Sequence, residues 1–370
     1  MRLGGTGISE RWVVAPLVAL AFLLLITASA QAAKPTVVLV RAEKSGISEG
    51  TSATVDAQCP KGYDVLGGSV FIDGNSAFAH RTETAPLVKS HMFRAVITNP
   101  LVNDFAGIPE STASVQIGAE CAVSGRPVVV DGAFPSASSL KPGKSRGTVK
   151  QVLETQTGID NGSVTNTTAK CPSGTSIFGG GFALGGSPWT HMSDASVASV
   201  LNGWYGGIVY PPFDPALGIL RRSASMRVLA LCAATGQPLV LSSGASVQGS
   251  SEGPVASRGP RRAAPKRSDS TIVLVKETQG GIDSGEVRTV RAKCPNGYSV
   301  FTGSYSISDS AIAIATTEGV LSKLNSFETT VTNPPPDING GLPKTTASVT
   351  VGAVCARSGV PIVLDTPFPS

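Results

Sequence analysis

One stretch of sequence occurs three times in this 370-residue chain, and this repeat limits the folds open to it. Each copy begins with Cys-Pro-x-Gly and ends with Cys-Ala-x-x-Gly-x-Pro. The three copies run from Cys59 to Pro127, from Cys171 to Pro238 and from Cys294 to Pro361. A fixed period of this kind marks a chain built from repeated structural units, so we expect one fold in three copies.

The six cysteines occupy matching places, two in each copy. Six cysteines allow 15 pairings, but a copy that folds as one unit joins its own two. The expected bridges are Cys59–Cys121, Cys171–Cys232 and Cys294–Cys355. Each would close a long loop and stabilise the fold by about 4 kcal/mol. Buried free thiols are the alternative, since cysteine packs as a small apolar side chain.

Residues 1–32 have the pattern of a secretory signal peptide. Two arginines precede the apolar run Val13–Ile26, and Ala30-Gln31-Ala32 forms a small-x-small cleavage site. An uncleaved membrane anchor is the alternative, because no charge interrupts the stretch from Trp12 to Ala33. We expect a secreted protein, periplasmic or extracellular, with no transmembrane segment after signal removal. In such a compartment disulfides persist, which favours bridges over free thiols.

The remaining chain has the pattern of an all-β protein. Short β-branched runs such as Thr51–Ala57 and Val65–Ile72 are bounded by Gly, Pro, Asn or Asp. An aromatic residue recurs at Phe93, Trp204 and Phe327, and we expect it in the core of each copy. The pattern favours three tandem antiparallel β-sandwich-like modules, each with one internal disulfide. Three sheets around a pseudo-threefold axis are the alternative.

Composition divides the chain into three β modules and two linkers. The modules cover residues 33–131, 149–241 and 269–370, and the linkers cover residues 132–148 and 242–268. Both linkers lack apolar periodicity, and flexible linkers of this length would hold the modules as separate beads. The formal net charge is +5, and its positive charge is concentrated in the linkers. Nucleic-acid binding is not expected, because the modules lack a basic face with interleaved aromatic residues.

No catalytic or cofactor motif stands out in the sequence. The three histidines are not at metal-ligand spacing, and no phosphate-binding glycine loop is present. Asp160 and Asp283 occupy matching positions in two copies, and a glycosidase would need two such carboxylates about 5–10 Å apart. They lie in Gly-Ile-Asp-x-Gly segments, however, which are typical of turns. We therefore expect no cofactor, no metal and no enzymatic activity.

The middle copy contains the candidate binding residues. Trp189 lies in a Gly-Ser-Pro-Trp-Thr-His stretch that has no clear counterpart in the other copies. An exposed indole ring beside polar side chains would suit stacking on a sugar. The candidate site comprises Trp189, His191, Asp194 and Tyr205. A tryptophan packed against its own module is the alternative.

Each copy opens with Cys-Pro-x-Gly-x-x-Val/Ile-x-x-Gly and closes with Ala-x-Cys-Ala after an Asn-Pro or Tyr-Pro step. This pattern resembles a repeat of uncharacterised secreted bacterial proteins and covers nearly all of residues 36–131, 148–241 and 270–370. The resemblance implies a shared β module with a bridge and implies no activity. The middle copy departs from it at Tyr210, where the others have Asn.

These patterns predict a secreted, non-enzymatic repeat protein that binds a surface or mediates adhesion. A glycan or an anionic envelope polymer is the expected partner, and nucleic acid is not. Two alternatives remain open: a structural envelope or matrix protein without a specific ligand, and a secreted hydrolase. The sequence does not specify the oligomeric state.

Overall fold

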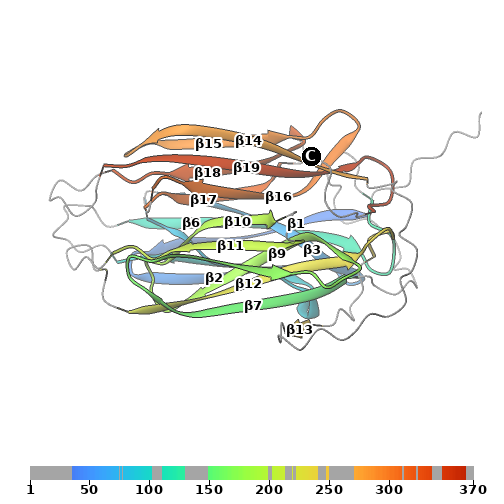
Figure 1. The fold of residues 1–370 in the computed structure, drawn as a ribbon, viewed down its shortest axis with the longest axis horizontal. Coiled ribbons are helices and arrows are strands. Elements are labelled where there is room, and N and C mark those ends of the chain that lie inside the picture. Colours follow the sequence, from blue (N-terminus) through green and yellow to red (C-terminus); the bar gives the residue numbers. More distant parts are fainter. Residues whose placement is uncertain are drawn as a thin grey trace, which may run out of the picture. The chain divides into compact units, whose positions relative to one another are not determined.

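The computed structural model describes the chain in eleven stretches and two isolated positions. These are residues 36–74, 76, 78–101, 111–129, 149–198, 202–212, 219, 222–240, 247–249, 271–310, 312–321, 324–335 and 344–363. The described residues form an all-β structure, which confirms the predicted fold class (Figure 1). Their one helical element is a 3₁₀ turn, Val88–Ser90. The predicted signal, residues 1–32, and the first linker, residues 132–148, lie outside the described residues.

Each copy contributes six strands, which Figure 1 colours from blue in copy 1 to red in copy 3. Copy 1 holds β1 Val37–Ser48, β2 Thr51–Gln58, β3 Tyr63–Gly74, β4 His80–Leu87, β5 Met92–Asn99 and β6 Thr112–Val123. Copy 2 holds β7 Val149–Asp160, β8 Val164–Lys170, β9 Thr175–Gly185, β10 His191–Ala198, β11 Gly203–Val209 and β12 Ser223–Ala234. Copy 3 holds β14 Ile272–Asp283, β15 Val287–Lys293, β16 Tyr298–Ser308, β17 Ile314–Leu321, β18 Ser326–Thr332 and β19 Thr346–Arg357.

One further strand lies inside the predicted second linker. It is β13, Val247–Gly249, and it pairs in parallel with β7. This part of residues 242–268 is therefore an added edge strand, while the rest of that linker lies outside the described residues.

Every copy is a sandwich of two three-stranded layers. In copy 1, β1, β6 and β3 form one layer, and β2, β5 and β4 form the other. The Cys59–Cys121 bridge joins the end of β2 to β6 and therefore ties the two layers together. Cys171–Cys232 and Cys294–Cys355 do the same in copies 2 and 3, so the predicted pairing is confirmed.

The recurrent aromatic residue fills the space between the two layers, as predicted. Phe93, Trp204 and Phe327 are each at most 5% exposed. Each ring covers a glycine of the facing layer: a Cβ added at Gly68 would lie 2.4 Å from the Phe93 ring. Because the glycine leaves room for the ring, the Gly-rich third strand and the aromatic residue form one packing unit.

The sheets continue from one copy into the next, which differs from the expectation of separate beads. The 1–3 sheet has the order β1-β6-β3-β17-β18-β15, the 3–2 sheet β14-β19-β16-β10-β11-β8, and the 2–1 sheet β7-β12-β9-β4-β5-β2 with β13 beside β7. Two residue pairs form each junction, for example Phe71 with Thr317 and Val70 with Glu318. In an isolated copy β3 and β4 would be open edges, and pairing with a neighbouring copy satisfies their backbone groups. The copies therefore form three shared sheets around a pseudo-threefold axis.

A ring of three backbone hydrogen bonds lies on this axis. The amide of Val128 donates to the carbonyl of Leu239 (2.8 Å), Leu239 donates to Ile362 (2.7 Å), and Ile362 donates to Val128 (2.9 Å). All three residues are fully buried. The segment that follows each closing Gly-x-Pro thus meets its two counterparts and closes the assembly.

Candidate functional site

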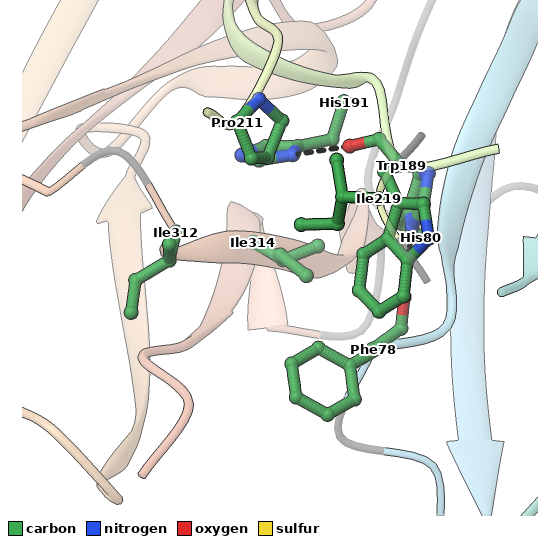
Figure 2. Close-up of a pocket in the computed structure, with 8 residues that line it drawn as sticks. All are labelled: Phe78, His80, Trp189, His191, Pro211, Ile219, Ile312 and Ile314. Atoms are coloured by element: carbon green, nitrogen blue, oxygen red, sulfur yellow. Dashed lines mark hydrogen bonds between the residues drawn. The ribbon is translucent and has the colours of Figure 1, made fainter. Parts of the chain in front are cut away.

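The indole of Trp189 is buried on the axis and is not an exposed platform. It is 6% exposed, and its ring centroid lies 5.6 Å from that of Phe78 in copy 1, edge to face. Figure 2 shows the two rings side by side. The predicted sugar-stacking surface is therefore absent at this residue. The alternative, a tryptophan packed against its own module, also needs correction, because the Trp189 ring contacts Phe78 of copy 1.

His191 belongs to the same axial contact. The small cavity in Figure 2 is about 20 Å³ and is lined by matching pairs from the three copies. The pairs are Phe78 with His80, Trp189 with His191 and Ile312 with Ile314. A cavity of this size holds about one water molecule and excludes a sugar. Burial, together with the nearby His80, lowers the pKa of His191 to about 3, so this imidazole is neutral.

Asp194 and Tyr205 lie apart from this cavity, at the junction of the 3–2 sheet. Asp194 of β10 is directly opposite Ser306 of β16, and it hydrogen-bonds with the hydroxyls of Ser306 and Ser196. Burial raises the pKa of Asp194 to about 6, against the effect of these hydroxyls and of Lys276. The pKa of Tyr205 is raised by burial and by the neighbouring Asp194 charge. The structure therefore brings together two of the four predicted residues at a boundary between copies.

A groove lies at such a boundary over the 1–3 sheet, and we call it the 1–3 groove. Its volume is about 430 Å³, within the range of small-molecule sites. β1, β6 and β3 of copy 1 form one side, and β17 with Leu324 of copy 3 forms the other. The lining side chains are Leu39, Arg41, Ser69, Phe71, Gln116, Ile117, Val320, Leu321 and Leu324.

Two glycines shape the 1–3 groove. A Cβ on Gly118 would lie 2.6 Å from the Ser69 hydroxyl, so a side chain at this position of β6 would require Ser69 to move. A Cβ on Gly319 of β17 would lie 2.6 Å from the Phe71 ring. The half-buried Phe71 side chain therefore crosses the junction and covers the glycine of the next copy. The result is an apolar surface with Arg41 and Gln116 beside it.

A second groove, the 2–1 groove, lies at the matching junction of copies 2 and 1. Its volume is about 230 Å³. Matching lining positions in the two grooves are Leu39 and Gln151, Arg41 and Leu153, Phe71 and Ala183, Gln116 and Arg227, Gly118 and Leu229, and Leu321 and Leu87. Glu83 of this groove occupies the place of Asp194 in the 3–2 sheet. Burial raises the pKa of Glu83, while Arg94 and Arg227 oppose the rise.

Sequence reasoning did not find the groove residues, because none belongs to a recognisable motif. The available signal was the alignment of the copies, which places Arg41 and Lys276 at the same position of the first strand in copies 1 and 3. Copy 2 has Leu153 there, and the basic residues that line the 2–1 groove are Lys89 and Arg227. That these positions form a groove follows only from the pairing of sheets between copies.

Copy 1 has a further cleft of about 410 Å³ beside its disulfide. Here the buried Asp64 contacts His91 at 2.7 Å, and His91 has a left-handed backbone with φ of 51°. Asn202 and Asn325 occupy the His91 position in the other copies, where each side chain bonds two backbone groups of the adjacent strand. Neither Asp64 oxygen has a hydrogen-bond partner, so copy 1 replaces the amide network of the other copies with an Asp64–His91 contact.

Asp160 and Asp283 are the last residues of β7 and β14 and are exposed. They belong to different copies, and Asp283 accepts a hydrogen bond from the Thr346 hydroxyl at 3.0 Å. Their places at strand ends agree with the turn interpretation. No group of three His, Cys, Asp or Glu residues suited to a metal ion occurs among the described residues.

No known protein family matches this chain, and no curated protein is similar to it in sequence. The three disulfides indicate an oxidising environment, extracellular or periplasmic. Within the described stretches, no helix has the length and apolar character needed to cross a membrane.

Proposed function

We propose that the chain is a secreted, non-enzymatic binding protein that attaches to a glycan or a related envelope polymer. The 1–3 groove is the observation that carries this proposal. It is open, has a volume of about 430 Å³, and is built from two copies of the repeat. The leader pattern in residues 1–32 and the three disulfides support an exported protein.

The lining of the 1–3 groove suits a sugar polymer. A sugar ring has apolar faces and a polar edge, and a binding site for it combines apolar surface with a few placed polar groups. Phe71 and Leu324 supply apolar surface, and Leu324 is 51% exposed. Arg41 and Gln116 supply hydrogen-bond donors, and Arg41 also suits an anionic substituent.

The test is binding of the chain from residue 33 onward to an array of glycans and purified envelope polysaccharides. Arg41→Ala removes a charged donor from the groove, and affinity should fall about tenfold. Arg288→Ala is the matched control, because this arginine is an exposed cation in β15, away from the groove. A chain that binds no polymer, or one whose affinity is unchanged by Arg41→Ala, would contradict the proposal. Silence on the array together with resistance to extraction would favour a structural protein.

A further inference from the structure

A buried arginine links the first and last copies of the chain. Arg81 of β4 is 2% exposed, and its Nη1 lies 2.5 Å from Oε1 of Glu318 in β17. Its guanidinium carbon lies 5.0 Å from the centroid of the Tyr305 ring in β16. Both partners belong to copy 3, so one side chain of copy 1 makes two contacts with a copy that is distant in sequence.

This set of side chains occurs once among the three copies. The strand registers place Met192 and Ala315 at the position of Arg81, and Thr84 and Ala195 at the position of Glu318. Val70 and Phe182 hold the position of Tyr305. The other two boundaries between copies therefore lack this charged pair.

Backbone pairing alone does not determine the order in which the three copies follow one another around the axis. Each junction is made by the same two-residue pairing of equivalent strands. Three such copies can close around the axis in two cyclic orders, with copies 2 and 3 exchanged. Residues 130–148 connect copies 1 and 2 and, extended, span roughly 60 Å, so their length does not choose between the orders.

We propose that the Arg81–Glu318 pair fixes the cyclic order of the three copies. In the exchanged order, Arg81 would meet Ala195 and Phe182 in place of Glu318 and Tyr305. Glu318 would also lose its cation. A buried charge without its partner is strongly destabilising, whereas the intact pair adds little net stability over an apolar substitute. The pair therefore discriminates between two arrangements that share the same backbone pairing.

The experiment uses a reporter disulfide across the 1–3 junction. Phe71 and Thr317 are strand partners there, and they are adjacent only when copy 3 lies beside β3. Phe71→Cys with Thr317→Cys is introduced into the chain, which is then unfolded, reduced and refolded under oxidising conditions. Peptide mapping measures the fraction of chains that carry the reporter bridge together with the three native bridges.

With Arg81 and Glu318 present, nearly all chains should carry the reporter bridge. Arg81→Met with Glu318→Ala installs the residues of copy 2 at both positions, and leaves no unpaired charge. We expect the fraction of chains without the bridge to increase about tenfold, because the apolar replacement no longer disfavours the exchanged order. An unchanged bridge yield in this double variant would overturn the proposal, even if the variant unfolded at a different urea concentration.

The matched control is the exposed ion pair Asp56–Arg94, which lies within copy 1 at 2.8 Å. Asp56→Ala with Arg94→Met removes an arginine–carboxylate pair inside copy 1 and leaves Arg81 and Glu318 in place. Its bridge yield should equal that of the reporter chain alone. A loss of yield in this control comparable to that of the buried pair would also contradict the proposal.

Discussion

Glu120 makes the stability of the protein depend on pH. It lies in the middle of β6, is 1% exposed, and neither carboxyl oxygen has a hydrogen-bond partner. Leu231 and Val354 occupy its place in the other two copies. Burial raises the pKa of Glu120 to about 8. An isolated carboxylate in such surroundings is unfavourable, so the folded protein keeps the proton.

The magnitude follows from the two pKa values. The ordinary value of 4.5 applies to the unfolded chain, and about 8 applies to the folded chain. Below pH 4.5 both states are protonated, and the group imposes no penalty. As pH rises from 4.5 to 8, the unfolded chain releases its proton and the folded chain does not, so stability falls. At 1.36 kcal/mol for each pKa unit, the loss reaches about 5 kcal/mol above pH 8, as an upper value.

Urea denaturation at pH 4, 6 and 8, followed by tryptophan fluorescence, measures this loss. Glu120→Gln preserves the shape without the charge, and Glu120→Leu installs the residue of copy 2. The free energy of unfolding of either variant, relative to that of the parent chain, should increase by about 3–5 kcal/mol between pH 4 and pH 8. Glu43→Gln, at an exposed position of β1, should show no such growth. If the difference between parent and Glu120→Gln is the same at pH 4 and pH 8, the reasoning is wrong.

Three further predictions concern other parts of the structure. Trp189→Ala should lower the free energy of unfolding by about 3–5 kcal/mol, because it empties the axial contact; polymer binding in the 1–3 groove, measured on folded protein, should be unchanged. Asp64→Ser with His91→Asn installs the hydrogen-bond network of copies 2 and 3. The free energy of unfolding should rise by about 1 kcal/mol for each hydrogen bond gained. A melting temperature below that of the parent chain would contradict this prediction. Cys171→Ser with Cys232→Ser should lower the free energy of unfolding, measured by urea denaturation, by about 2–5 kcal/mol. Cys294→Ser with Cys355→Ser removes the equivalent bridge of copy 3 and provides the comparison.

The sequence predicted those features that depend on local pattern and on spacing within a copy. The strands follow from β-branched runs between turn residues, and the disulfides follow from the matching cysteine positions. The core position of Phe93 follows from its recurrence in each copy. These properties need no knowledge of how the copies meet.

The sharing of sheets could not be predicted in the same way. The pairing of Phe71 with Thr317 joins residues of different copies through a two-residue contact, and no periodicity marks it. Trp189 shows the consequence, because its polar neighbours suggested an exposed loop. The surface that buries it exists only after three copies assemble around the axis. Asp194 and Tyr205 lie near each other, but at a junction between copies that the sequence did not reveal.

The ring formed by Val128, Leu239 and Ile362 uses only main-chain atoms. Almost any residue with an amide hydrogen can maintain it, so the three copies can diverge in side chains while the closure persists. Such a closure tolerates inequality among the repeats: Glu120, Arg81 and His91 are positions at which copy 1 has residues that copies 2 and 3 lack.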